Sequence, residues 1–98
     1  MKAKQLLKRR VVLAADVFAE LLLWDVPVPV FGSRHNYKYS LALVCAGVCV
    51  LRYDNERGKG DHRHTDNIEM AYPFKDVSTL LSDFQSDTER WLNENRNT

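Results

Sequence analysis

The sequence lacks the features that mark a membrane or a secreted protein, and it carries little net charge. No run reaches the roughly 18 uninterrupted apolar residues that a membrane span requires. The apolar stretch after the basic N-terminus is interrupted by Asp16 and Glu20, which makes it a poor signal peptide. The net charge is +1, so the overall charge favours neither a nucleic acid nor another class of partner. Only Cys45 and Cys49 are present, and two buried, reduced cysteines suit a cytoplasmic protein.

The length of the chain allows one domain. A chain of 98 residues has room for a single core, so we expect residues 1–98 to form one unit. The apolar share is ordinary at 45%, and the charged share is slightly high at 28%. A domain this small buries a modest fraction of its surface, and we expect its stability to be marginal without a partner.

The N-terminal third has the pattern of a β-hairpin followed by a loop. Residues 4–13 and 18–24 are rich in β-branched and aliphatic side chains, which favours two strands. The same residues are rich in leucine and alanine, so a helix remains an alternative. Residues 25–36 contain two prolines and a glycine and end in a basic tip, which predicts a loop rather than a regular element.

A second hairpin is predicted around Ala46-Gly47. Residues 37–44 alternate between apolar and polar side chains, and residues 48–53 form a second apolar strand pattern. A two-residue turn would place Leu41 opposite Arg52 on one face of the sheet. A lone arginine on that face needs an acidic or anionic partner, so we expect Arg52 to be partly buried and to anchor either the structure or a phosphate. The two cysteines flank this turn, point to opposite faces and cannot pair.

The C-terminal third predicts a short strand and an amphipathic helix. Residues 68–72 can return as an edge strand that ends at Pro73. Asp76 is a suitable N-cap for a helix of about four turns, and Thr88 is the one polar residue on its apolar stripe. The other residues of the stripe are Val77, Leu80, Leu81, Phe84, Trp91 and Leu92. The predicted fold is therefore α+β: an antiparallel β-meander of about four to five strands, including two hairpins, packed by one C-terminal amphipathic helix.

Residues 54–67 contain no apolar side chain, so we expect them to form an exposed loop. Two glycines bracket Lys59, which allows the backbone to approach a ligand closely. His62 and His64 can transfer protons near neutral pH. The residues that could bind a phosphate or the rest of a substrate beside them are Arg34, His35, Lys38, Arg52, Asp54 and Asn55. Together these side chains would form a small site that binds or cleaves a phosphodiester.

Two other interpretations of this segment stay open. A polar segment with glycine, aspartate, asparagine and lysine is often only a long connection between strands. His62 and His64 could instead bind a metal ion together with Asp54 or Asp61, because alternate residues of an extended segment point the same way. Glu69 is the only other well-placed carboxylate. Because no further ligands are suitably spaced, we expect neither a metal ion nor another cofactor.

Two stretches of the sequence are distinctive in combination. Residues 33–39 read Ser-Arg-His-x-Tyr-Lys-Tyr. Residues 48–64 read Val-Cys-Val-Leu-Arg-Tyr-Asp-Asn-Glu-x-Gly-Lys-Gly-Asp-His-x-His. With these motifs the chain resembles the TumE family of bacterial toxin–antitoxin toxins, from about Leu6 to Trp91. One departure is Ala46-Gly47, where Asp-Gly is more usual, and it affects the turn rather than the site.

The resemblance implies a toxin that is encoded beside a DNA-binding antitoxin, and it implies no particular mechanism. One hypothesis is a metal-independent endoribonuclease. In it, Arg34, Arg52 and Lys59 hold the phosphate, and His62 and His64 exchange protons. The predicted catalytic residues are His62, His64 and Lys59. RNA suits such a site because its own 2′-hydroxyl can act as the nucleophile once it is deprotonated. The alternative is a non-catalytic module that inhibits a cellular target by binding it.

The first hairpin has two apolar faces. The residues predicted for one face are Val11, Leu13, Phe18, Leu22 and Trp24, and those for the other are Val12, Val17, Leu21 and Leu23. A single helix can cover only one side of a small sheet. We therefore expect the uncovered face to form either a homodimer interface or a tight interface with the antitoxin.

Overall fold

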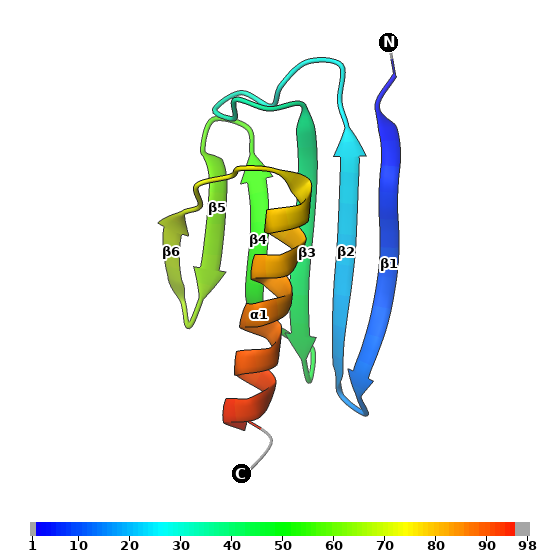
Figure 1. The fold of residues 1–98 in the computed structure, drawn as a ribbon. Coiled ribbons are helices and arrows are strands. Elements are labelled where there is room, and N and C mark those ends of the chain that lie inside the picture. Colours follow the sequence, from blue (N-terminus) through cyan, green and yellow to red (C-terminus); the bar gives the residue numbers. More distant parts are fainter. Residues whose placement is uncertain (1, 96–98) are drawn as a thin grey trace.

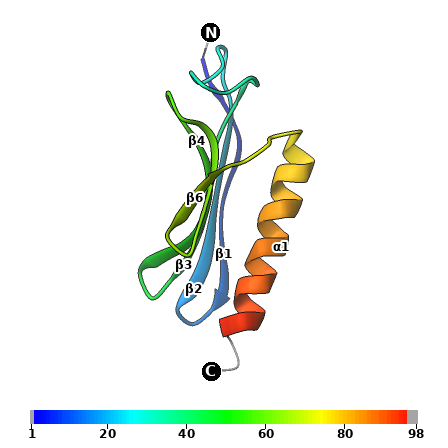
Figure 2. The same cartoon turned by 90° about the vertical axis from the view of Figure 1, so that its left-hand side faces the viewer.

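Within residues 2–95, which the computed structural model describes, the chain forms one antiparallel sheet and one helix. The elements are β1 (Lys4–Ala14), β2 (Val17–Asp25), β3 (Tyr37–Cys45), β4 (Val48–Glu56), β5 (Gly60–Thr65), β6 (Ile68–Ala71) and α1 (Val77–Asn95). The strands lie side by side in the order of the sequence, and every neighbouring pair is antiparallel. Figures 1 and 2 show α1 against one face of this sheet. We call this face, which carries Tyr39 and Leu41, the helix face, and the other, which carries Ser40 and Ala42, the open face.

The predicted α+β meander with a C-terminal helix is confirmed, and the helical alternative for the first hairpin is wrong. The sheet has six strands rather than four to five, because the predicted loop over residues 54–67 is largely strand. β4 continues to Glu56 and β5 begins at Gly60. Strands form there although the segment has no apolar side chain, because other parts of the protein bury some of its polar side chains. Asp54 is 7% exposed and Asn55 is 0% exposed.

The β3–β4 hairpin has the predicted two-residue turn but a different register. The turn residues Ala46-Gly47 have positive φ angles of 50° and 79°, as a tight hairpin turn requires. A β-bulge near the turn adds one residue to β4, so Tyr53 lies opposite Leu41. The predicted pairing of Leu41 with Arg52 is therefore wrong. Arg52 lies opposite Ala42 on the open face, and it is half-buried, as expected.

The core lies between the helix face and α1. Its buried apolar residues are Val17, Ala19, Leu23, Tyr39, Leu41, Leu43, Leu51, Tyr53, Tyr72, Leu80 and Phe84. Asp76 caps the helix, as predicted, by accepting a hydrogen bond of 2.6 Å from the backbone N–H of Thr79. Asp87 of α1 accepts hydrogen bonds from the Tyr53 hydroxyl and, at 2.7 Å, from Arg63 Nε. The predicted apolar stripe is confirmed, and these polar contacts fix the helix on the sheet.

The first hairpin presents different faces from those predicted. Val11 lies opposite Ala19 and Val12 lies opposite Phe18, so the odd-numbered residues of β1 and β2 share the helix face here. The predicted grouping of Val11 with Phe18 is wrong, because residues directly opposite each other in an antiparallel pair lie on the same face. The open face of the hairpin therefore carries Val12 beside Phe18.

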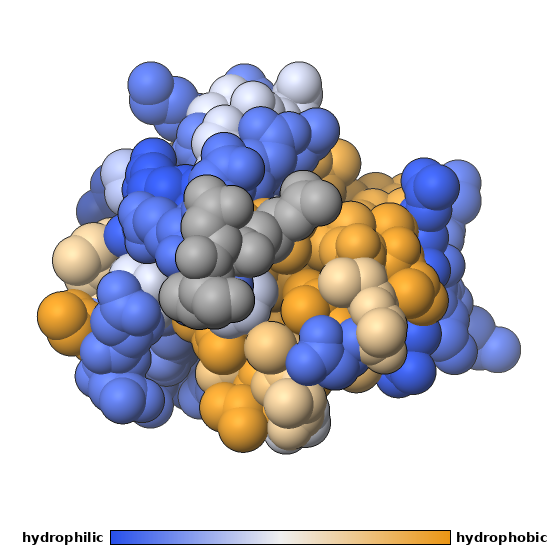
Figure 3. Space-filling view, turned by 90° about the horizontal axis from the view of Figure 1, so that it is seen from below, coloured by the Kyte–Doolittle hydropathy of each residue, from blue (hydrophilic) through white to orange (hydrophobic). Residues whose placement is uncertain are grey.

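Hydrophobic side chains gather at the end of the sheet that carries the β1–β2 and β3–β4 turns (Figure 3). The exposed large apolar residues there are Val12, Leu13 and Val48. The two cysteines near this end form no disulfide bond, and Cys45 is half-buried. Cys49 is exposed, and its predicted burial is wrong, because it lies on the face that no helix covers.

At the opposite end of the sheet, the loop of residues 26–36 packs against the β4–β5 turn. The N–H of Gly58 donates a hydrogen bond of 2.6 Å to the carbonyl of Phe31. A Cβ atom on Gly60 would lie 2.7 Å from the carbonyl oxygen of Gly32, which is too close for a carbon atom. Gly60 therefore packs closely against this loop, and the close approach of the backbone to a ligand stays a prediction.

We predict that Gly60→Ala destabilises the protein far more than Gly47→Ala. The φ angles of the two glycines are 75° and 79°, so each substitution introduces a backbone strain of about 1–2 kcal/mol. Only at Gly60 does the added methyl group also meet backbone atoms, which costs about 1–3 kcal/mol more. Urea unfolding of the two variants measures the difference. Equal losses of stability would contradict the close packing of Gly60 against Gly32.

Candidate functional site

The pairing of β4 with β5 distributes the polar residues of the motif over both faces of the sheet. Asn55 lies opposite Asp61 on the helix face, whereas Asp54 lies opposite His62 on the open face. Because side chains alternate along a strand, His64 shares the open face with His62. The motif therefore contributes to two separate polar clusters.

On the helix face, the carboxylate of Asp61 is the centre of a partly buried cluster. It accepts hydrogen bonds from the hydroxyl groups of Ser33, at 2.7 Å, and Tyr39, at 2.6 Å. His35 Nε2 lies 2.7 Å from the same carboxylate. The backbone N–H of Tyr37 donates to His35 Nδ1 at 3.2 Å, so Nε2 carries the ring proton and donates to Asp61. Burial, followed by the hydrogen bond to Asp61, raises the pKa of the Tyr39 hydroxyl above its usual range.

Asn55 extends this cluster to the backbone of β3. Its amide group donates a hydrogen bond of 2.7 Å to the Tyr37 carbonyl and accepts one of 2.9 Å from the Tyr39 N–H. The ring of Phe74 stacks on His35 with a centroid distance of 3.7 Å. His35 and Asn55, which the sequence suggests as ligands of phosphate or substrate, are thus occupied in holding the chain together.

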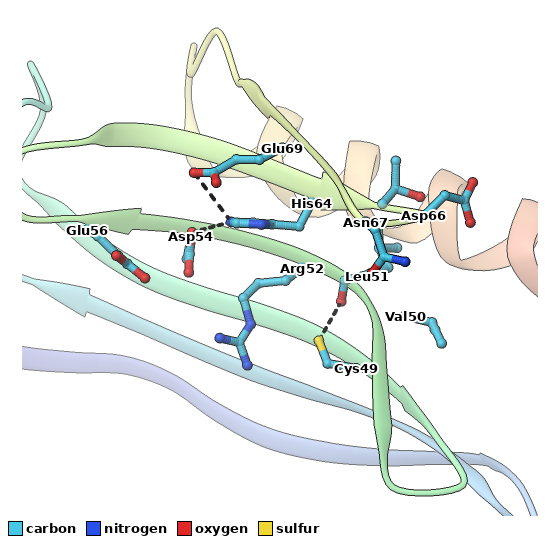
Figure 4. A pocket seen from close by; sticks show the side chains of 11 residues that line it. Cys49, Val50, Leu51, Arg52, Asp54, Glu56, His64, Asp66, Asn67 and Glu69 are labelled. Atoms are coloured by element: carbon cyan, nitrogen blue, oxygen red, sulfur yellow. Dashed lines mark hydrogen bonds and ion pairs between the residues drawn. The ribbon is translucent and has the colours of Figure 1, made fainter.

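On the open face, His62 and His64 converge on the carboxylate of Glu69 in β6. The Nε2 atom of His62 lies 3.7 Å from Glu69 Oε1, and that of His64 lies 3.9 Å from the same oxygen. His64 Nε2 also lies 3.7 Å from Asp54 Oδ1 (Figure 4). His62 Nδ1 lies 3.1 Å from the carbonyl oxygen of Gly60. Because a carbonyl can only accept, Nδ1 carries the proton of the neutral His62 ring and Nε2 does not.

Arg52, Asp54, His64 and Glu69 line a surface groove of about 430 Å³. Figure 4 shows their side chains on the same side of the sheet, projecting from neighbouring strands. Arg52 is half-buried, and its Nε atom is buried without a hydrogen-bond partner. A buried donor without a partner is uncommon in folded proteins. Four acidic residues, Asp54, Glu56, Asp66 and Glu69, line the same groove.

Asp54 is a buried carboxylic acid in this groove. Burial raises the pKa of its carboxyl group above the usual range, and the neighbouring His64 ring opposes that shift. An ionised carboxylate held at such a position reduces the stability of the fold. Residues of this kind are typical of functional sites.

The other predicted site residues lie near the β4–β5 turn. Lys38 is on the open face, and its Nζ donates a hydrogen bond of 3.3 Å to the carbonyl of Asn55. Lys59 is exposed in the turn, 3.9 Å from the Glu56 carboxylate, and Arg34 is exposed in the preceding loop. Neither Lys59 nor Arg34 lines the groove that contains His64.

Glu69 lies in the candidate site, whereas the sequence suggests it only as a carboxylate for the metal alternative. It reaches the histidines because β5 and β6 form a tight hairpin through Asp66 and Asn67, whose φ angles are positive at 50° and 64°. Asp and Asn are residues that favour such a turn. Register counted from this turn places Glu69 opposite His64, so the Asp-Asn dipeptide is the sequence signal that identifies it.

Within residues 2–95, no group of three or more histidine, cysteine, aspartate or glutamate side chains is arranged to hold a metal ion. No helix in this range is long and apolar enough to span a membrane.

Comparison with known proteins gives one finding. A family model described as the toxin TumE matches residues 2–92 of the 98-residue chain. No curated protein and no solved structure matches the chain. The matched region contains every strand and nearly all of α1, and with them both polar clusters. The chain belongs to the TumE toxin family.

Proposed function

We propose that this TumE toxin is an endoribonuclease whose active site lies on the open face, at His62 and the groove that His64 lines. The observation that carries the proposal is the convergence of His62 Nε2 and His64 Nε2 on one oxygen of Glu69, at 3.7 and 3.9 Å. Two imidazole rings that meet at one point can exchange protons with the two sides of a phosphodiester. The half-buried Arg52 beside them supplies positive charge for the developing transition state.

RNA brings its own nucleophile, so the protein supplies only a base, an acid and cations. In the proposed reaction His62 Nε2 removes the proton of the 2′-hydroxyl, and the 2′-oxygen attacks phosphorus. The bond from phosphorus to the 5′-oxygen breaks, and this oxygen leaves with a proton from His64. The products are a 2′,3′-cyclic phosphate and a free 5′-hydroxyl, and the two histidines end with exchanged protonation states.

The surroundings of the two rings support this division of roles. The hydrogen bond from His62 Nδ1 to the Gly60 carbonyl leaves Nε2 unprotonated in the neutral ring, as a base requires. His64 Nε2 lies 3.7 Å from Asp54 and 3.9 Å from Glu69, and two carboxylates suit a ring that carries a proton to donate. Glu69 lies near both rings, so the contacts that distinguish the two histidines are Gly60 for His62 and Asp54 for His64.

The cations are proposed to bind the RNA backbone. Arg52 would bind the reacting phosphate, because this half-buried cation lines the groove beside His64. Lys38, farther along the open face, would bind a neighbouring phosphate. The exposed side chains of Lys59 and Arg34 add positive charge near the β4–β5 turn and attract RNA over a longer range. The scheme uses side chains alone and is therefore metal-independent.

The partner that we propose is a DNA-binding antitoxin encoded nearby, and the proposed location of the pair is the cytoplasm. The apolar end of the sheet, where Val12, Leu13 and Val48 are exposed, supports an interface there. Either the antitoxin or, in a homodimer, a second copy of the chain would cover this surface.

We predict that His62→Ala combined with His64→Ala abolishes toxicity and leaves the fold intact. An acid or base group contributes about 10²–10⁴-fold, so RNA cleavage should fall by at least about 1,000-fold. Both rings lie on the open face, outside the core between the sheet and α1, so the melting temperature and antitoxin binding should stay unchanged. A growth assay, an RNA cleavage assay and thermal unfolding measure these effects on one variant.

His35→Ala is the matched control. The ring of His35 is stacked on Phe74 and bound to Asp61, so its loss should lower the melting temperature rather than remove a catalytic group. If the folded double variant remains fully toxic, the histidines of β5 are not catalytic. The non-catalytic module that inhibits its target by binding would then replace the enzyme.

We predict that Asp54→Asn lowers toxicity but stabilises the fold at neutral pH. Burial raises the pKa of the Asp54 carboxyl, so the folded protein binds this proton more tightly than the unfolded chain does. The native state therefore loses stability as the pH rises through the raised pKa, whereas an amide does not titrate. The stability gained by the variant should be smallest at low pH, grow on going to neutral pH and then level off. Urea unfolding at several pH values measures this gain.

Asp76→Asn is expected to show the opposite trend. Hydrogen bonds from Thr79 lower the pKa of the Asp76 carboxyl, so its ionised form stabilises the folded state and that contribution is lost as the pH falls. Relative to the parent, this control should lose stability on going from acid to neutral pH. A pH-independent effect of Asp54→Asn, or a loss of stability at neutral pH, would contradict the buried charge at Asp54.

A further inference from the structure

The loop of residues 26–36 exposes two large apolar side chains that the proposed reaction does not use. Val28 is 73% exposed and Phe31 is 72% exposed. They border a hollow of about 530 Å³, whose other lining residues are Pro29, Val30, Lys38 and Arg57. An aromatic ring therefore lies beside two cationic side chains at one end of the open face.

The loop that carries Phe31 is held at its base and at its tip. The N–H of Val26 donates a hydrogen bond of 2.8 Å to the carbonyl of Asn36 and closes the base. The carbonyl of Phe31 itself accepts a hydrogen bond of 2.6 Å from the N–H of Gly58. A backbone that is fixed in this way and still holds a large apolar ring in water is typical of a binding surface.

The cations determine which ligand suits the hollow. Lys38 donates one hydrogen bond to the carbonyl of Asn55, so two of the three N–H groups of its ammonium remain for a ligand. Arg57 offers a planar group of donors that matches phosphate geometry. No acidic residue is among the lining residues. A ligand with both a flat apolar surface and a negative charge fits these groups, and a nucleotide has both.

The hollow and the proposed active site lie on the same face of the sheet. Lys38 and Ser40 are alternate residues of β3, about 6.6 Å apart along the strand, and Ser40 lies opposite Asp54. The next alternate residue, Ala42, lies opposite Arg52. Ser40 and Ala42 therefore lie beside groove residues, one and two alternate positions along β3 from Lys38, so an extended RNA chain can reach both places.

We propose that the hollow at Phe31 binds an unpaired nucleotide close to the one that is cleaved. Its base would stack on the Phe31 ring, and a phosphate would lie at Lys38 and Arg57. This inference rests on the proposed endoribonuclease activity and adds the substrate class, which is single-stranded RNA. A base inside a duplex is already stacked and paired, so it cannot lie on the ring.

The test measures binding separately from cleavage. The protein that carries His62→Ala and His64→Ala is titrated with a labelled, unstructured oligoribonucleotide, and with the same RNA annealed to its complement. In this background Phe31→Ala should weaken single-strand binding about tenfold or more and leave the weaker duplex binding unchanged. Phe31→Trp should retain binding, and RNA should quench the added indole fluorescence.

The control variants separate the ring from the charges. Lys38→Ala and Arg57→Ala should each reduce the slope of log affinity against log salt concentration by about one. Val12→Ala removes an apolar side chain that is 73% exposed, like that of Val28, but lies at the other end of the sheet. This variant should bind RNA as its parent does.

If Phe31→Ala does not change the binding of single-stranded RNA, the inference is overturned, even if the toxin cleaves RNA. Equal affinity for the single strand and the duplex also overturns it, as does a Phe31→Ala variant that loses only antitoxin binding. A third outcome separates the two proposals. If the protein with both histidines cleaves no RNA, but binding of single strands still depends on Phe31, the nucleotide site is retained and only the proposed catalysis is overturned.

Discussion

The carboxylate of Asp61 is the contact on which both proposed sites depend. It accepts hydrogen bonds from Ser33 and Tyr39 and binds the ring of His35, so it joins the 26–36 loop to β3 and β5. Asp61 points to the helix face in order to make these contacts. Alternation along β5 then directs the two histidines that follow it, one residue and three residues later, to the open face. One buried acceptor thus positions the loop with the exposed phenylalanine and orients the proposed catalytic rings.

The parts of the fold that depend on local pattern could be predicted from the sequence, and the parts that depend on distant partners could not. Alternation, turn residues and the helical stripe give both hairpins and the helix. Residues 54–67 have no apolar pattern, and the partners that bury Asn55 and Asp61 come from distant segments. In the site, the histidines share a face as expected. A β-bulge brings Arg52 beside them, and a hairpin turn brings Glu69, so neither position follows from residue type.

The two faces of the sheet differ in how well their polar groups are satisfied. On the helix face, the side chains of Asn55 and Asp61 have hydrogen-bond partners within the chain. On the open face, Asp54 has a raised pKa, Arg52 Nε has no partner and the nearby loop holds Phe31 in water. Local features that reduce stability are expected to collect where a ligand binds. On the side of the helix face, Thr88 Oγ1 of α1 is also buried without a partner. Only on the open face do such features lie beside charged side chains and histidines, and this is the physical basis for assigning function to it.

The central claim is that the open face cleaves RNA through the 2′-hydroxyl of its substrate. Purified toxin with two oligoribonucleotides that differ by a single 2′-deoxy nucleotide at the mapped cleavage position tests this claim most directly. The account predicts that the unmodified RNA is cut there and leaves a 2′,3′-cyclic phosphate, and that the deoxy-substituted RNA is not cut at that position. Cleavage of both RNAs at equal rates, or intact RNA in the presence of a toxin that arrests growth, would contradict it.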